Sequence, residues 1–246
     1  MSLSYSDTGH KYYAEIRGKK YHVPSVTSVL GVLAKPALIP WAVNQAIDLI
    51  RPSITPGVEH AESYLEQVYE SAKKEASRLK RAAGDVGTEA HTVLERYPDI
   101  PTLPDGPVGR CVAGGVAWLE SAKPEWKIKE QPIYSRRYRF SGRLDGLAVI
   151  AGRLSLVDWK SSKGIYPEYR LQTAAYNAAW EEEHPEDRIE QRVLIHLGKE
   201  DGSFTPYIYP RDTLRKDFYA FLCALGLYKR IRELEKESHK SKNQEV

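Results

Sequence analysis

Three strand-like segments follow one another closely in the middle of the chain, between residues 127 and 161. Their sequences are KIKEQPIYS, YRFSGRLDGLAVI and LSLVDWKS, separated by short polar or glycine-containing turns. Strands joined by such short turns are expected to pair antiparallel, so this region is committed to a β-sheet. Two further strand candidates, RVLIHLG and FTPYIYP, follow a helix predicted over 167–183.

The flanking regions are mostly helical in pattern. Residues 11–23 alternate apolar and polar side chains around an Arg-Gly-Lys-Lys turn, which is typical of a hairpin. Helices are predicted from Ser25 or Thr27 to Leu33, from Pro40, over 59–97, over 112–122 and over 212–234. Gly84 and Gly87 mark a break within 59–97, which fits either two helices or one kinked helix. Residues 51–57 and 98–107 should be connections, and the tail from 235 should fray. This order predicts an α/β fold, a mixed β-sheet core flanked by helices, with a helical N-terminal region.

Length and composition limit the classes of protein to which this chain can belong. A chain of 246 residues without repeats is expected to form a single domain, 1–246, made of an N-terminal hairpin and helical region (1–83), a core (84–210) and a C-terminal helix with a polar tail (211–246). Only Cys111 and Cys223 are present, which excludes a four-cysteine iron–sulfur cluster. No apolar leader or run of 18 apolar residues occurs, so we expect a cytoplasmic protein without membrane association. The 36 basic residues barely exceed the 33 acidic ones, so any nucleic-acid site must be argued from position.

Two aspartates and a lysine converge in the second and third core segments. Alternation along LSLVDWK places Asp158 and Lys160 on one face of a strand. A two-residue turn at 151–152 would set Asp145 opposite Asp158, whereas longer turns would set it opposite Trp159 or Lys160. Directly opposed residues have Cβ atoms about 5 Å apart, which is a metal-site distance. Such carboxylates repel unless a proton or cation lies between them, and oxygen ligands suit Mg²⁺ or Mn²⁺; the alternative is an Asp–Lys salt bridge at a strand end.

The segments GRLDGLAVIAGRLSLVDWKSS and EYRLQTAAYNAAW resemble the PD-(D/E)XK nuclease superfamily, in its RecB-like exonuclease branch. Asp158 and Lys160 supply the (D/E)XK part, and Asp145 supplies the upstream aspartate, preceded here by leucine in place of proline. Gln172 and Tyr176 match the downstream Gln-x-x-x-Tyr motif. The opening YHVPSVTSVL is similar to that of phage and mitochondrial genome maintenance exonucleases. The resemblance implies a restriction-endonuclease-like fold.

The same resemblance implies further ligands. GTEAHTVLE matches a helical Gly-x-x-x-His element and makes His91 an additional metal ligand, with Glu95 one turn later, although an isolated helical histidine is more often structural. Glu130 lies where some relatives carry an acidic residue. The implied cofactor is Mg²⁺, for which Mn²⁺ can substitute. Asp145 and Asp158 would hold one or two ions, with the backbone carbonyl of Trp159 as a further ligand. Lys160 would orient or deprotonate the attacking water or stabilise the phosphorane.

Basic residues near these motifs are candidates for DNA contacts. Guanidinium groups match phosphate oxygens, and a solvated strand face is the alternative. The candidate substrate-binding residues, including the polar pair of the downstream motif, are Arg137, Arg139, Arg143, Lys163, Arg170, Gln172 and Tyr176. The basic residues at 73–81 on the long helix are more typical of a solvent-exposed face, because acidic residues lie among them.

The carboxylate arrangement predicts a divalent-metal-dependent nuclease, and the resemblance implies an exonuclease that hydrolyses phosphodiester bonds from a DNA end, in recombination, repair or replication. Its partner would be DNA, single-stranded or with an accessible end, and a helicase or a single-strand annealing or binding protein could work beside it. The resemblance to viral enzymes would place a phage protein in the host cytoplasm. The alternatives are a structure-specific endonuclease of the same fold and a non-catalytic DNA-binding subunit.

Overall fold

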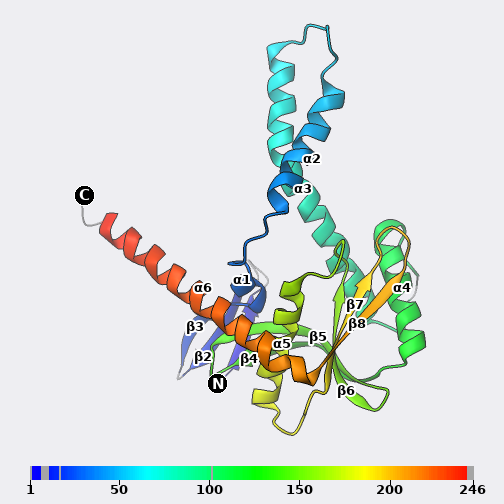
Figure 1. Ribbon diagram of the computed structural model, residues 1–246, viewed down its shortest axis with the longest axis vertical. Coiled ribbons are helices and arrows are strands. Elements are labelled where there is room, and N and C mark those ends of the chain that lie inside the picture. The colour runs from blue at the N-terminus through cyan, green and yellow to red at the C-terminus, as the bar shows by residue number, and fades with distance from the viewer. Residues whose placement is uncertain (1, 7–10, 17, 101, 243–246) are drawn as a thin grey trace.

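A five-stranded mixed sheet forms the centre of the computed structural model, which describes residues 2–6, 11–16, 18–100 and 102–242 (Figure 1). The strand order is β4-β5-β6-β7-β8; β6 and β7 pair in parallel, and the other neighbours pair antiparallel. The strands are β4 Glu125–Ser135, β5 Phe140–Ile150, β6 Arg153–Lys160, β7 Gln191–Leu197 and β8 Phe204–Pro210. The predicted fold class, a mixed sheet flanked by helices, is confirmed.

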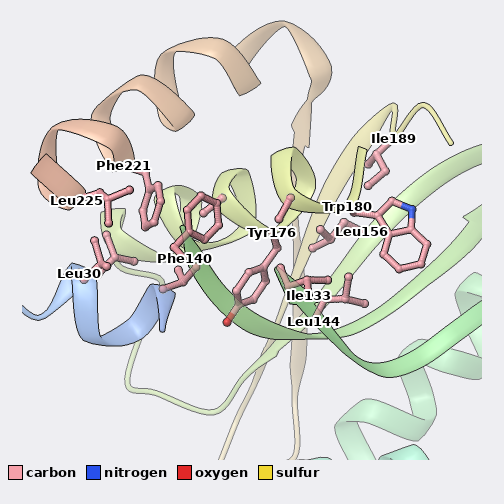
Figure 2. Packing of buried hydrophobic residues seen from close by; sticks show 14 of the residues in the cluster. Leu30, Ile133, Phe140, Leu144, Leu156, Tyr176, Trp180, Ile189, Phe221 and Leu225 are labelled. Atoms are coloured by element: carbon pink, nitrogen blue, oxygen red, sulfur yellow. The ribbon is translucent and has the colours of Figure 1, made fainter. Parts of the chain in front are cut away.

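Helices cover both faces of this sheet. Against one face pack α1 Val26–Leu30, α5 Pro167–Glu183 and α6 Leu214–Lys242, and Figure 2 shows the apolar cluster between them. Against the other face pack α3 Glu62–Glu95 and α4 Gly106–Ala122. The alternation of β6 explains this arrangement, because Leu156 enters the first cluster while Val157 and Trp159 enter the second. The central strands β6 and β7 are therefore buried on both sides, whereas most of the edge strand β8 is exposed.

A two-residue turn joins β5 to β6. Ile150 pairs with Arg153, and the intervening Ala151 and Gly152 have φ angles of 49° and 76°. Positive φ at both central residues is the requirement of a type I′ turn, whose twist matches that of the flanking strands. The shortest of the three predicted connections is thus the observed one. The β5–β6 ladder ends at Gly146 and Val157, one residue before Asp145 and Asp158.

The N-terminal region adds a second, three-stranded sheet of β1 Ser2–Ser6, β2 Lys11–Ile16 and β3 Lys19–Val23. The predicted hairpin over 11–23 is confirmed, and β1 is an addition to it. Tyr12, Ala14 and Val23 form a small cluster with Tyr134 of β4. Ser25 caps α1 by accepting a hydrogen bond from the backbone N–H of Ser28 at 3.1 Å, and this helix ends at Leu30, before the expected Leu33.

An arm made of α2 Leu38–Ser53 and the first half of α3 projects from the body of the molecule (Figure 1). The expectation of a connection over 51–57 is wrong in part, because α2 continues through Pro52. Of the two alternatives for this segment, two separate helices is wrong, since α3 is one continuous helix of 34 residues. Gly87 has a packing role instead: a Cβ there would lie 2.7 Å from Ser161 Oγ, just beyond β6.

Two other helices differ from expectation at their ends. α4 begins at Gly106, six residues before the predicted start, so the connection after α3 is shorter than expected. α6 follows a 3₁₀ turn at Arg211–Thr213 and continues to Lys242, where the sequence predicts a frayed tail from 235. Ion pairs three residues apart, Arg230 with Glu233 and Arg232 with Glu235, support this extension. None of the described helices is both long and apolar enough to cross a membrane.

Candidate metal centre

Side chains from α3, β4 and β5 converge beside the end of β6. Nδ1 of His91 lies 3.6 Å from Oδ2 of Asp145. The ligand atoms of His91, Glu130 and Asp145 all lie within 4.8 Å of one another, and all three residues are partly buried. One cation could contact all three groups, since donor atoms around a divalent ion are separated by comparable distances.

Glu130 reaches this group through an unusual backbone conformation. Its neighbours Lys129 and Gln131 pair with Gly146 and Leu144, so Glu130 lies across from Asp145 in the β4–β5 register. Its φ angle is 49°, in the left-handed region that a residue with a Cβ adopts at a cost of about 1–2 kcal/mol. Strain of this kind inside a strand persists where the surrounding structure fixes it, as happens at functional sites.

The third strand, β6, contributes Asp158 and Lys160. The Asp158 side chain is 1% exposed, and its Oδ2 lies 2.5 Å from Nζ of Lys160. The backbone N–H of Trp159 donates a hydrogen bond of 2.8 Å to Oδ2 of Asp145, which ties the two strands together beyond the end of their ladder. Asp158 therefore faces Lys160, while Asp145 faces His91 and Glu130.

A polar chain leads from Lys160 into α5. Nζ of Lys160 donates to Gln172 Oε1 at 3.2 Å, and Nε2 of Gln172 donates to the Tyr176 hydroxyl at 2.8 Å. The ring of Tyr176 fits against Gly142, where a Cβ would approach the ring to 2.5 Å. Lys160 Nζ also lies 4.7 Å from the ring centre of Tyr169. Sequence reasoning misses Tyr169, although it precedes Gln172 by three residues and so shares its helix face.

Burial of these acids without enough positive charge shifts their pKa values upward. Burial raises the pKa of Asp158 to about 6, even though Lys160 opposes the shift. Burial raises the pKa of Glu130 to about 7, and the charge of Asp145 adds to the effect. The pKa of Asp145 is also raised by burial, against the opposing effects of Lys160 and the Trp159 N–H. Each shift shows that negative charge in this cluster lacks a sufficient partner.

The two basic groups of the site differ in charge state. Burial, together with the charge of Lys160, lowers the pKa of His91 to about 4, so His91 is neutral at neutral pH and keeps a lone pair. The backbone of Trp159 hydrogen-bonds to this ring. Burial disfavours the charged form of Lys160, but Asp158 and Asp145 outweigh that effect and raise its pKa. Lys160 is therefore a stable cation.

These properties fit a divalent cation. Metal ligands must be deprotonated, and a neutral imidazole beside two carboxylates satisfies that condition. Carboxylate oxygens suit Mg²⁺ and Mn²⁺. An added cation would also supply the positive charge whose shortage raises the pKa values of Glu130 and Asp145. Glu95, at the end of α3, lies near enough to raise the pKa of Glu130 further, so it borders the site.

Comparison with solved structures finds distant similarities. One is to an alkaline exonuclease, LHK-Exo, from Laribacter hongkongensis, with 13% identity and a TM-score of 0.41 over 88% of this chain and 93% of that one. Another is to SSO0001, with 12% identity and a TM-score of 0.32 over 76% and 86% of the two chains. No protein-family model matches the sequence, and no curated protein matches it. Because both TM-scores lie below 0.5, these similarities carry no functional inference.

Only some of the residues predicted to contact DNA lie near the candidate metal centre. Arg143 lies beside the site, with a terminal nitrogen 3.7 Å from Glu130 Oε2, and Lys163 is exposed on the loop that follows β6. Arg170 is directed elsewhere, because its guanidinium group binds Asp217 of α6. Arg137 and Arg139 lie in the β4–β5 turn, where the backbone N–H of Arg137 donates to Glu182 near the end of α5. That turn is five residues of strand away from Asp145.

A second group of potential ligands occurs in the loop after α5 and includes His184 and Asp187. Its members already have other contacts. Asp187 accepts a hydrogen bond of 3.1 Å from Nε1 of Trp180, and the His184 ring stacks on the same indole with centroids 3.9 Å apart. This group caps the indole at the end of α5, and it lacks the strained backbone and buried acids found around Asp145.

Proposed function

We propose that this chain is a divalent-metal-dependent DNA exonuclease. The observation that carries the proposal is the joint placement, beside one strand end, of a neutral histidine, two facing carboxylates and a buried Asp158–Lys160 pair. The first three groups supply cation ligands, and the pair supplies a fixed positive charge next to them. Phosphodiester hydrolysis needs both, because charge develops at phosphorus during the reaction.

His91, Glu130 and Asp145 would hold the cation, with Asp158 and the carbonyl of Trp159 at its border. When bound, a divalent cation would acidify a water molecule and neutralise phosphate charge. Lys160 is held in place by Asp158, Gln172 and the ring of Tyr169. Because its pKa is raised, Lys160 keeps its proton at neutral pH, which favours stabilising the phosphorane or orienting the water over deprotonating it.

The substrate side of the proposal rests on position and charge. Arg143 and the exposed Lys163 border the site and can bind phosphates that flank the cleaved bond. Gln172 accepts a hydrogen bond from Lys160 and donates one to Tyr176, and both side chains can contact water beside Lys160. The resemblance of several motifs to genome maintenance exonucleases supports cleavage from a DNA end, and it supports a role in recombination, repair or replication of phage or bacterial DNA in the cytoplasm. A helicase or single-strand annealing or binding protein is the kind of partner that such a role implies.

The test uses end-labelled linear single-stranded and duplex DNA together with closed circular DNA, in Mg²⁺, Mn²⁺ or EDTA. We expect metal-dependent loss of linear DNA and intact circles. Lys160→Ala should lose activity by at least about 10²–10³-fold, as removal of a single charge-stabilising group typically does. Lys216→Ala, which removes an exposed lysine of α6, is the matched control and should be fully active.

Other outcomes discriminate among functions. Cutting of closed circles would replace the exonuclease with a structure-specific endonuclease. Full activity of Lys160→Ala would contradict the assignment of the site. Binding of DNA without cleavage in either metal would make the chain a non-catalytic DNA-binding subunit.

A further inference from the structure

The long helix α3 carries basic residues toward the candidate metal centre. Lys80 precedes His91 by 11 residues on the same unbroken helix. At 3.6 residues per turn, the two side chains leave the helix within about 20° of each other, and about 16 Å separates them along the axis. Arg81 lies beside Lys80 on the next position around the helix. Lys80 therefore lies on the same face of α3 as His91, and Arg81 leaves the helix about 80° from His91.

The five basic residues of this segment are not equivalent. Lys73 donates to Glu70 at 2.5 Å, and Arg78 binds both carboxylate oxygens of Glu75 at 2.7 and 2.6 Å. Lys74 lies 3.9 Å from Glu70. By contrast, Lys80 and Arg81 are exposed and make no ion pair within the part of the chain that the structure describes. Their charge is therefore available to another molecule.

The surface of α3 between Lys80 and His91 includes a position without a side chain. Gly84 lies on the same face, within about 20° of His91. A Cβ at Gly84 would meet no atom within 4 Å, so this position borders open space. A polymer lying along the helix could follow this face from Lys80 past Gly84, up to the point where Ser161 packs against Gly87.

We propose that Lys80 and Arg81 bind backbone phosphates of the DNA strand at a fixed distance from the bond that is cut. This inference rests on the proposed function and specifies how the substrate lies. Along one strand of a duplex, 16 Å corresponds to about five nucleotides, at about 3.4 Å each. DNA that extends about five nucleotides or more from the cleavage point reaches Lys80 and Arg81, and shorter pieces do not.

Binding is measured in EDTA, so that no cleavage occurs, by fluorescence anisotropy of a labelled single-stranded 20-mer and a labelled trimer. The variant is Lys80→Ala/Arg81→Ala. The matched control is Arg78→Ala, which removes a charge from the same turn of the helix but one that Glu75 already binds and that lies about 140° from His91. All three residues are exposed, so folding is expected to be unaffected.

We expect the double variant to bind the 20-mer on the order of tenfold more weakly and the trimer as the unmodified protein does. Its salt dependence should weaken by about 0.7 in the slope of log K against log salt for each phosphate that the variant no longer binds. In Mg²⁺ or Mn²⁺, cleavage of the trimer should be unchanged, while the 20-mer should show a raised KM.

Two results would overturn the inference. If the unmodified protein binds and cuts DNA but the double variant matches Arg78→Ala on the 20-mer, the path along α3 is wrong and the proposed function stands. If the unmodified protein neither binds nor cuts DNA of any length, both proposals fail together.

Discussion

Two buried clusters of charged side chains flank the sheet core, and they are built on opposite principles. The carboxylate cluster comprises His91, Glu130, Asp145, Asp158 and Lys160. The arginine cluster comprises Arg170 of α5, Arg192 of β7 and Asp217 of α6, with Arg192 only 1% exposed. The first holds three acids against one lysine. The second holds two arginines against one aspartate.

The arginine cluster binds most of its donor groups to its own fold, although burial lowers the pKa of Arg192 and the Arg192 Nε has no partner among the described residues. Arg192 donates to Asp217 at 2.6 Å, to Thr213 Oγ1 at 2.8 Å and to the carbonyl of Arg170 at 2.8 Å. The ring of Tyr209 lies 4.7 Å from the Arg170 guanidinium. In the carboxylate cluster, burial raises the pKa values of all three acids, and only one lysine is available to oppose these shifts. The comparison teaches that buried charges stabilise a fold where groups of the chain bind most of them. Buried acids that lack enough counter-charge from the chain instead form a candidate site for an external cation.

The largest expected effect is on activity, in Asp145→Asn. The amide keeps an oxygen for the Trp159 N–H but loses the ligand charge, so we expect cleavage to fall on the order of 10⁴-fold, about 5.5 kcal/mol in activation free energy. The same variant should unfold at a higher temperature than the unmodified protein in EDTA, because it removes uncompensated negative charge. Cleavage assays and thermal unfolding test both halves. If the variant were both inactive and destabilised in EDTA, the charge of Asp145 would stabilise the fold, as the charges of the arginine cluster do.

The next effect is on stability, in Asp217→Ala. Removing the only acid of the arginine cluster leaves Arg192 buried without a counter-charge, and such losses cost about 3–5 kcal/mol. Urea unfolding measures this change, and Asp212→Ala, at an exposed position two residues before α6, is the matched control. A loss below about 1 kcal/mol would show that the cluster does not hold α6 to the sheet.

Addition of Mn²⁺ should separate the two clusters directly. A ligand at 100 times its Kd stabilises the folded state by about 2.7 kcal/mol. We expect the unmodified protein and Asp217→Ala to gain this stabilisation and Asp145→Asn to gain little of it. Equal stabilisation of all three proteins in calorimetry would locate the cation away from Asp145.

The smallest effect concerns pH and Glu130. Its folded pKa of about 7 lies above the ordinary value for glutamate, so the folded state favours its protonated form. The stabilisation of the folded state by protonated Glu130 is complete below about pH 4 and is lost as the pH rises toward 7. In EDTA, the unmodified protein should therefore lose roughly 2 kcal/mol relative to Glu130→Gln between pH 5 and pH 8. A pH-independent difference between the two proteins would mean that Glu130 is not buried beside Asp145.

Several elements could be predicted from sequence because local patterns determine them. The helix over 167–183 and the strands around it match the structure, since proline, periodicity and turn residues mark their ends. The unbroken α3 could not be predicted, because the advantage of Gly87 comes from Ser161, 74 positions away in the chain. The full length of α6 could not be predicted either, because a polar tail carries no apolar periodicity and is held helical by local ion pairs.

The candidate site shows the same division. The placement of Asp158 and Lys160 follows from strand alternation, and the nearness of Asp145 follows from a short turn. The position of Glu130 is hard to predict because nothing in KEQPI signals a left-handed residue inside a strand. Sequence alone groups Arg170 with substrate contacts because its partner, Asp217, comes from a helix 47 residues later. Long-range pairings of this kind are outside the reach of local patterns.

The two-residue turn between β5 and β6 also determines toward which face of the sheet each β6 side chain points. Odd and even positions of β6 serve different layers, with Val157 and Trp159 in one core and Leu156 in the other. If the turn kept two residues, a single inserted residue would shift β6 by one position and exchange the two sets, so Val157 would occupy the place of Asp158. Chain length is thus constrained here more tightly than residue identity. Insertions of two residues leave each β6 side chain on the same face of the sheet. We therefore expect natural or engineered variants of this turn to differ in length by even numbers of residues.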